Sequence, residues 1–334
     1  KKSLRANRQM VCSLAASAVD DQADEDQPAN AAAVPMALRC ARVAATATVL
    51  AILLVPWAVL LGCEEAARLL TRSGEYRARR LGWRQLTWMY DDVAWLATRC
   101  TGAYSAMRWS WPDARTGSRV VLTFDDAPGD NEESLCELLG LLEEYGARAT
   151  FFCTTSLIAG REGLMRRIVA AGHELCNHMP HDRSYALLGE PAFAADLRAA
   201  EEALAPFQPQ LPPPSARTWF RPPMGAMSCA MARVLQREGY SPLLGDVFSN
   251  DVFVGGGRRG TQAGAATVAW HVEYCARRTK PGSVVIFHVP RARDRLSVVP
   301  ITRGFLEWCE SRGLSCVTAS ELAASHVGAN NVLP

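Results

Sequence analysis

The sequence predicts an α/β fold, namely a distorted or incomplete (β/α) barrel of about seven units, preceded by a single transmembrane helix. The barrel is indicated by short apolar runs that alternate with amphipathic stretches beyond residue 118, and by glycines where the helices would end. The membrane helix is indicated by residues 43–63, which contain no charged side chain. With 334 residues, of which 49% are hydrophobic, the chain can form one large domain with extensions.

The N-terminal part is expected to contain a disordered tail, residues 1–42, and then the membrane anchor. In the tail, an acidic patch from Asp20 to Asp26 precedes the stretch PANAAAVP, and no apolar period persists. Residues 43–63 read VAATATVLAILLVPWAVLLGC, and about 20 apolar residues suffice to span a bilayer. A buried core helix and a removed signal peptide are the alternatives for this segment.

Residues 64–118 are expected to form a helical juxtamembrane linker. Trp83, Leu86, Tyr90 and Trp95 recur at nearly helical intervals, as in an amphipathic helix that packs on the following domain. The main domain is expected at residues 119–325, followed by a C-terminal tail at residues 326–334.

Seven apolar runs in this main domain are expected to be strands. They occupy residues 120–124, 149–153, 173–178, 218–223, 240–246, 283–289 and 314–318. Six amphipathic stretches separate them, at residues 132–145, 162–171, 191–206, 228–238, 265–279 and 298–312. Gly146, Gly172, Gly239 and Gly313 fall at the expected helix ends. Repeated strand–helix units of this kind predict a parallel sheet flanked by helices.

Most of the expected strands end in residues capable of chemistry, which is where barrel enzymes place their active sites. Asp125 and Asp126 end the first strand, His178 the third and His288 the sixth, while Arg221 lies in the fourth. A single residue of this kind is usually a helix cap or a buried core histidine. Their recurrence at the same end of successive strands predicts a shared site instead.

The residue types in this set point to metal-assisted hydrolysis of an acyl group. Neighbouring side chains alternate in direction along a strand, so Asp125 and Asp126 are expected to have different roles, one as a metal ligand and the other as a base. His178, with a carboxylate or imidazole three or four residues later, offers further ligands from one turn. His288 follows a strongly apolar run and is a candidate general acid.

Residues 123–128, TFDDAP, resemble the TFDDGP motif of the polysaccharide deacetylases, the NodB-homology domain of carbohydrate esterase family 4. The resemblance extends from about residue 119 to 322 and includes the ATFF strand, the GHEL turn and the WFRPP strand, in the family's order. It implies a distorted (β/α) barrel that removes N-acetyl or O-acetyl groups from carbohydrates.

The resemblance also implies a role for each matching residue. Asp125 would be the general base and Arg221 would orient it. Asp126 and His178 would be metal ligands, and the backbone N–H of Met224 would line the oxyanion site. Asp251 would pair with His288, the general acid.

Three positions depart from the family pattern. Ala127 replaces the usual glycine and Met224 the usual tyrosine. The family usually has a second histidine four residues after the first, where this sequence has Asp182. We expect Asp182 to be the third metal ligand, with His181 as the alternative. The expected divalent ion is zinc. Because an Asp-His-Asp set is harder than Asp-His-His, cobalt, nickel or manganese are the alternatives.

The expected function is therefore removal of acetyl groups, N-acetyl above all, from a carbohydrate such as chitin, peptidoglycan or a related glycan. The alternative is a deacetylase-like protein that binds carbohydrate with weakened catalysis. A serine or cysteine hydrolase is disfavoured because the chain has no G-x-S-x-G elbow. The glycine-rich residues 255–260 lack the phosphate-loop pattern, and a net charge of +2 disfavours a nucleic-acid partner.

The expected localisation is a single-pass membrane protein whose catalytic domain is luminal or extracellular, because the family's substrates usually lie outside the cytosol. The charges around residues 43–63 argue the other way. Arg39 and Arg42 precede the segment, but five arginines follow it, namely Arg68, Arg72, Arg77, Arg79 and Arg80. Long loops and folded domains translocate largely regardless of charge, which reconciles the two arguments. The sequence does not specify an oligomeric state.

Overall fold

The computed structural model describes residues 102–111, 114–208, 218–249, 251, 262–290 and 298–327. The chain divides into two compact units, Lys1–Glu65 and Ala66–Pro334, and all described residues belong to the second. The expected disordered tail, the anchor at residues 43–63 and most of the expected linker lie outside them. None of the helices that are described has both the length and the apolar character needed to cross a membrane.

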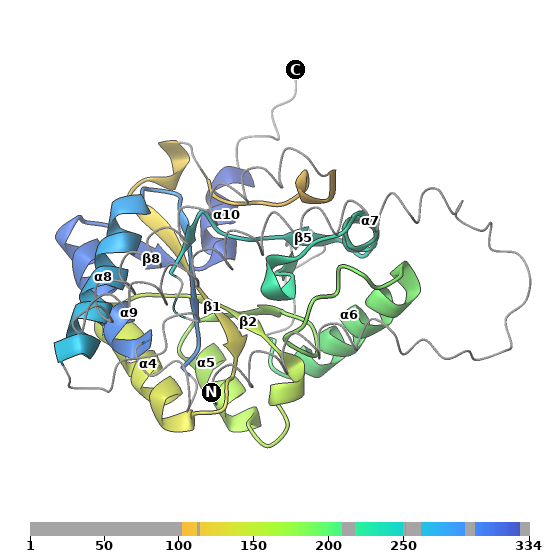
Figure 1. The fold of residues 1–334 in the computed structure, drawn as a ribbon, viewed down its shortest axis with the longest axis horizontal. Coiled ribbons are helices and arrows are strands. Elements are labelled where there is room, and N and C mark those ends of the chain that lie inside the picture. Colours follow the sequence, from red (N-terminus) through yellow and green to blue (C-terminus); the bar gives the residue numbers. More distant parts are fainter. Residues whose placement is uncertain are drawn as a thin grey trace, which may run out of the picture. The chain divides into compact units, whose positions relative to one another are not determined.

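The core of the described unit is one parallel sheet (Figure 1). Its strands run in the order β5-β4-β3-β2-β1-β7-β6, and β8 pairs with β1 in addition. The bounds are β1 Arg119–Ala127, β2 Thr150–Cys153, β3 Glu174–Asn177, β4 Thr218–Phe220, β5 Tyr240–Pro242, β6 Val247–Phe248, β7 Val284–His288 and β8 Ser315–Val317. Because this path has two ends in the described residues, the predicted incomplete α/β barrel is confirmed.

The helices fall close to the predicted stretches. They are α4 Glu132–Glu144, α5 Glu162–Ala170, α6 Glu190–Leu204, α7 Cys229–Arg237, α8 Gln262–Arg278, α9 Val298–Ser311 and α10 Ala319–Val327. Asn131 and Ser228 cap α4 and α7 by accepting backbone N–H groups of the first turn. Gly172 and Gly239 follow α5 and α7 with φ near +80°, a conformation that glycine adopts without steric cost.

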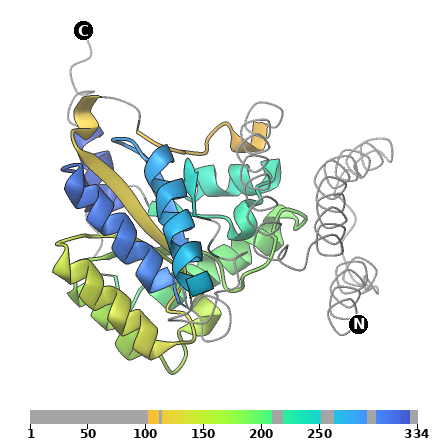
Figure 2. The ribbon, with the colours of Figure 1, turned by 60° about the vertical axis from the view of Figure 1, so that its left-hand side comes forward.

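Three helices pack together along one side of β1. Figure 2 shows α9 lying between α8 and α4, and α9 contacts both of them. On β1, every residue after Arg119 is buried, as is typical of a parallel strand covered on both faces. The ring of Phe124 stacks between those of Phe151 and Phe287, with centroids 5.2 and 5.9 Å away. Stacked aromatic rings therefore pack against β1 immediately before Asp125 and Asp126.

The single strand expected at residues 240–246 is wrong beyond Pro242, because β5 ends there and the chain crosses to the opposite end of the sheet, where β6 begins at Val247. β5 pairs with β4, whereas β6 pairs with β7. A four-residue connection, residues 243–246, bridges at most about 18 Å, so the sheet must curl strongly to bring its ends together. Gly245 makes this crossing feasible, since a Cβ atom there would lie 2.6 Å from Cγ1 of Ile286.

The described part of the expected linker is not α-helical. Residues 102–118 contain two 3-10 turns, η1 Gly102–Tyr104 and η2 Ala114–Thr116, and isolated bridges from Arg108 to Leu243 and from Ser110 to Ser283. The Trp111 ring meets the Trp219 ring edge to face at 5.7 Å. This segment therefore packs directly on the barrel.

Candidate functional site

The predicted chemistry-bearing residues gather at one edge of the sheet. Asp125 and Asp126 lie at the end of β1, His178 directly follows β3, Arg221 directly follows β4, and His288 ends β7. All of the strand pairings are parallel, so these C-terminal ends meet at the same edge.

A β-bulge directs both aspartates of β1 toward this site. In a regular strand their side chains would point to opposite faces. Asp126 instead has φ +64°, and the register with β2 shifts between Asp125 and Ala127. As a result, Asp125 Oδ2 lies 4.0 Å and Asp126 Oδ1 lies 3.8 Å from the same atom, Nε2 of His178. The alternation expected from the sequence is thus wrong at this point, and both carboxylates face one centre.

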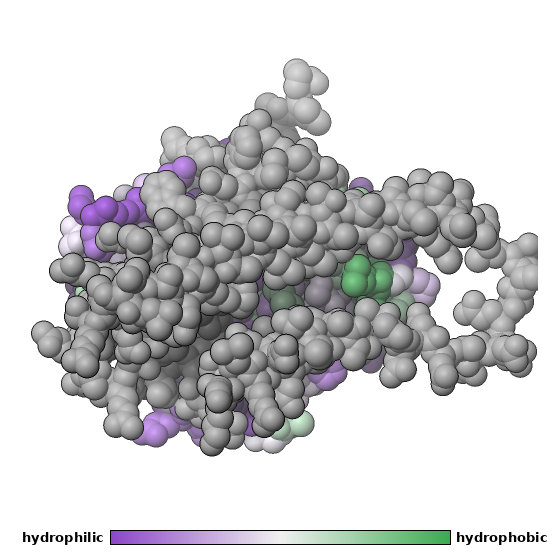
Figure 3. All heavy atoms as spheres, in the orientation of Figure 1, coloured by the Kyte–Doolittle hydropathy of each residue, from purple (hydrophilic) through white to green (hydrophobic). Residues whose placement is uncertain are grey.

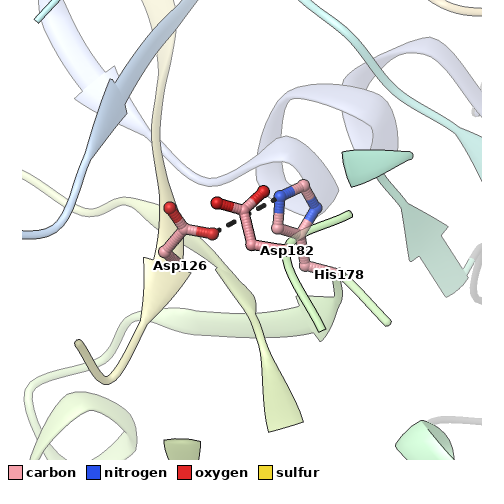
Figure 4. Close-up of side chains that lie close together, drawn as sticks. All are labelled: Asp126, His178 and Asp182. Atoms are coloured by element: carbon pink, nitrogen blue, oxygen red, sulfur yellow. Dashed lines mark ion pairs between the residues drawn. The ribbon is translucent and has the colours of Figure 1, made fainter. Parts of the chain in front are cut away.

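Asp126, His178 and Asp182 form a group with the geometry of a metal site (Figure 4). One nitrogen or oxygen atom from each residue lies within 4.8 Å of the other two. Asp126 and His178 are buried, whereas Asp182 is exposed. His181 does not belong to this group, and its backbone N–H instead donates to the Tyr185 hydroxyl at 3.3 Å.

The donor chemistry fits a divalent cation. His178 Nδ1 lies 2.8 Å from the backbone oxygen of Arg221, and since a carbonyl only accepts, Nδ1 carries the proton and Nε2 presents a lone pair to the site. Thr154 Oγ1 donates to Asp126 Oδ1 at 3.1 Å and thereby fixes that carboxylate. Two carboxylates and one oriented imidazole are a usual ligand set for catalytic divalent metals.

The side chain of Arg221 fixes the carboxylate of Asp125 by a hydrogen bond. Its Nη1 donates to Asp125 Oδ1 at 2.6 Å and to Thr123 Oγ1 at 2.8 Å. Its Nε and Nη2 donate to the backbone oxygens of Leu243 and Leu244. The guanidinium also lies 4.0 Å above the Phe152 ring and is buried. With these contacts Arg221 has little freedom to move, and Asp125 keeps a fixed positive partner.

His288 is paired with the buried Asp251. Nδ1 of His288 lies 2.8 Å from Asp251 Oδ1, and the backbone N–H of His288 donates to Oδ2 at 2.9 Å. Burial alone would raise the pKa of Asp251, but the neighbouring imidazole and the hydrogen bonds outweigh it and hold this pKa below its usual range. Asp251 is therefore a carboxylate that can stabilise a protonated His288.

The backbone around the site is unusual at three places. In the described residues, Asp126, Met179 and Met224 alone combine a side chain with positive φ, at +64°, +68° and +57°. Each lies in a segment that carries a candidate site residue, and strained backbone of this kind often accompanies function. The loop at Met224 is held by Tyr104, whose hydroxyl donates to the Gly225 oxygen and accepts from the Met227 N–H.

Two large apolar side chains stand out on the described surface, Leu187 at 84% and Met224 at 72% exposure. The face drawn in Figure 3 shows one compact apolar patch beside hydrophilic atoms. The side chain of Met224, where the family usually has tyrosine, is thus open to solvent.

Sequence reasoning missed Thr123 and Thr154, which support Asp125 and Asp126 through the hydrogen bonds given above. Thr154 directly follows β2, so the strand-end criterion that identified the acidic residues would also have found it. Asp246, by contrast, ends a predicted strand but lies at the opposite edge of the sheet. It accepts from the N–H of Val284, the first residue of β7.

Comparison with known proteins gives consistent matches. The family model described as polysaccharide deacetylase matches residues 113–243. A peptidoglycan-N-acetylglucosamine deacetylase of Bacillus cereus is 24% identical over 64% of this chain and 92% of its own length. A chitooligosaccharide deacetylase of Sinorhizobium fredii is 44% identical, but over only 20% of this chain and 31% of its own.

Two solved structures share the fold. The peptidoglycan N-acetylglucosamine deacetylase Bc1960 matches with a TM-score of 0.56 and 20% identity, over 66% of this chain and 95% of that one. A CE4 family pseudoenzyme from Bacillus anthracis matches with a TM-score of 0.54 and 18% identity, over 65% and 68% of the two chains. At this identity the likeness concerns the fold alone.

Proposed function

Because this chain belongs to the polysaccharide deacetylase family, we propose that it is a metal-dependent hydrolase that removes acetyl groups, foremost N-acetyl groups, from a carbohydrate such as chitin, peptidoglycan or a related glycan. The observation that carries the proposal is the convergence of Asp125 and Asp126 on Nε2 of His178, within 4.0 Å. A metal ligand and a base are thereby held side by side, as acyl hydrolysis requires.

Asp126, His178 and Asp182 would hold the divalent cation, with zinc as the first candidate and cobalt, nickel or manganese as alternatives. When bound, such an ion polarises the acetyl carbonyl and lowers the pKa of water at the site. The buried Asp126 and His178 are preset by Thr154 and by the backbone of Arg221, whereas Asp182 is exposed.

Asp125 is the general base in this proposal. Its Oδ1 accepts from Arg221, which leaves Oδ2, 4.0 Å from His178 Nε2, to take the proton of the attacking water. The backbone N–H of Met224 would stabilise the negative charge that develops on the acetyl carbonyl oxygen.

His288 is the general acid. Asp251 accepts from Nδ1, so Nε2 is the ring nitrogen that gives its proton to the departing sugar nitrogen as the carbon–nitrogen bond breaks. Water supplies the hydroxyl that stays on the acetyl carbon. The products are acetate and a free amino sugar.

The test is acetate release by the purified full chain from a panel of N-acetylated and O-acetylated glycans, before and after chelation and with each divalent metal added back. We expect release that chelation abolishes and one metal restores best. The second candidate, a carbohydrate-binding protein with weakened catalysis, is favoured by the carboxylate at position 182 where the family usually has histidine. Binding of glycan without acetate release, with metal bound, would establish that candidate instead.

We also propose that residues 43–63 anchor the protein in a membrane and that the deacetylase domain acts on the luminal or extracellular side. The support is the length of this uncharged segment, together with the extracellular glycans that such enzymes would act on.

A further inference from the structure

The hydrogen bonds of the His288–Asp251 pair continue into the interior through Ser249. The Ser249 hydroxyl donates to Asp251 Oδ1 at 2.8 Å, the same oxygen that accepts from His288 Nδ1. The backbone oxygen of Ser249 lies 2.7 Å from Nδ1 of His271, which belongs to α8. Ser249 and His271 are both completely buried.

In its hydrogen bond to the Ser249 oxygen, His271 is the donor. A carbonyl oxygen accepts, so Nδ1 of His271 must carry the proton. Its Nε2 is buried and has no hydrogen-bond partner among the described residues. Burial also lowers the pKa of His271, which keeps the ring neutral. The buried imidazole leaves Nε2 without a partner in the described part of the chain, and the hydrogen bond that it makes through Nδ1 holds the backbone of Ser249 in place.

Ser249 is held on three sides. Its N–H donates to the Ile286 oxygen of β7 at 3.1 Å, and its carbonyl accepts from His271. Its hydroxyl donates to Asp251 Oδ1. Asp251 in turn receives donors on both carboxylate oxygens. The plane of this carboxylate is therefore fixed relative to the imidazole of His288.

We propose that Ser249, locked by His271, is a positioning residue for the general acid. It orients Asp251 and thereby keeps the protonated His288 ring in the direction that delivers its Nε2 proton to the leaving group. This inference rests on the proposed function, because it assigns His288 to leaving-group protonation.

The leaving group gives the decisive kinetic test. An amide nitrogen departs only when protonated, whereas 4-nitrophenolate departs without a proton. In Ser249→Ala we expect kcat on an N-acetylated chitooligosaccharide to fall about tenfold or more, with KM unchanged, since hydrogen bonds to charged groups have effects of this size. Hydrolysis of 4-nitrophenyl acetate should stay within about twofold of the parent, because that ester needs no general acid.

Two further variants control for folding and packing. Ser249→Thr keeps the hydroxyl and should retain activity on the chitooligosaccharide. Ser283→Ala removes another serine–aspartate hydrogen bond, from Ser283 Oγ to Asp246 Oδ2 at 3.1 Å, just before β7 and at the end away from His288, and should leave both activities unchanged. An equal loss on both substrates in Ser249→Ala, or no loss on the chitooligosaccharide, would overturn the proposal.

A measurement that needs no turnover separates this inference from the proposed function. The ¹⁵N resonances of the imidazole of His288, assigned by their loss in His288→Gln, should report a single Nδ1-protonated tautomer in the neutral parent ring and a mixture in Ser249→Ala. An unchanged tautomer would refute the positioning role. If the parent released no acetate from any glycan, the proposed function would fall, while this spectrum would still test the hydrogen-bond chain.

Discussion

Two acidic residues that are adjacent in the sequence, Asp125 and Asp126, have different surroundings in the fold. Asp125 faces the guanidinium of Arg221, whereas Asp126 faces the hydroxyl of Thr154 and belongs to the metal-site group. The proposed roles of base and metal ligand thus correspond to two distinct sets of contacts. Mutation of one aspartate can therefore test one role without removing the other.

Asp125→Asn should abolish acetate release, by at least about 100-fold in kcat, while bound metal stays nearly unchanged. The asparagine oxygen can still accept from Arg221, so the loss reflects the missing base. Acetate assays and metal analysis of the same samples measure both effects. Asp196→Asn, at an exposed ion pair with Arg183, serves as the matched control. Activity that survives in Asp125→Asn would exclude Asp125 as the base.

Asp182→Ala should reduce metal content far more than His181→Ala, because only Asp182 shares the group with Asp126 and His178. Both residues are exposed, so neither change should disturb the core. Metal content per chain after dialysis measures the difference. The opposite ranking would move the third ligand to His181, and equal loss would mean that the turn itself had been disrupted.

The sequence predicts those site residues that belong to local motifs, and it does not predict features that depend on tertiary contacts. Asp125, Asp126, His178, Arg221 and His288 could be predicted because strand ends and motif spacing are local features of the chain. The bulge at Asp126 could not, since a positive φ at a non-glycine residue arises from tertiary contacts. Thr123 and Ser249 were also missed, because neither lies at the end of an expected strand.

At the level of elements, β3 has only four residues and depends on a buried polar contact next to it. β3 begins beside His173, whose Nδ1 accepts the Ala149 N–H at 3.3 Å and whose ring packs on Phe151. Burial, aided by the nearby Arg148, lowers the pKa of His173 to about 4. The residue directly before β3 is therefore a group whose protonation opposes folding.

The stability of the fold should depend on His173 between pH 6.5 and 4. The unfolded state binds its proton near the ordinary pKa and the folded state only near 4, so stability falls as the pH drops through this window. The loss between pH 7 and pH 5 should be on the order of 2 kcal/mol. Chemical denaturation at the two pH values, in the parent and in His173→Asn, measures it.

His173→Asn retains an acceptor for the Ala149 N–H but cannot titrate. We expect it to be less stable than the parent at pH 7 and the difference to narrow at pH 5. A difference that stays constant with pH would show that His173 is not the titrating group.

The predicted fifth strand shows that a local apolar pattern does not determine how strands pair. The apolar run at residues 240–246 contains β5 and the start of a crossing to β6. Its composition does not indicate which neighbour each half will pair with. Pairing is decided by the curl of the whole sheet and by the space that Gly245 leaves beside Ile286.

For the whole molecule, metal binding should be coupled to folding. Asp126 lies on β1 and His178 and Asp182 follow β3, so an ion held by all three would connect distant parts of the chain and bind the folded state alone. At 100 times its dissociation constant the ion should stabilise the fold by about 2.7 kcal/mol. Thermal unfolding with zinc, and again after chelation, should show a reversible rise in Tm that Asp182→Ala largely removes. The absence of any shift in the parent would contradict the metal site.

The proposed anchor predicts a defined topology. In sealed vesicles, protease added outside, on the face corresponding to the cytosol, should trim residues 1–42 and leave the region beyond residue 119 protected. Detergent should remove that protection. Digestion of the domain in intact vesicles would reverse the topology and point to a cytosolic sugar or a lipid-linked precursor as substrate.

The short strands at the two ends of the sheet have a consequence for solubility. An open barrel normally leaves two rows of unpaired backbone groups, which can recruit strands of other molecules. Here the terminal strands β5 and β6 have three and two residues, and Arg108 forms a bridge with Leu243 immediately after β5. Such brief edges give an incoming strand little to pair with. The brevity of these terminal strands thus also protects the protein from edge-to-edge aggregation.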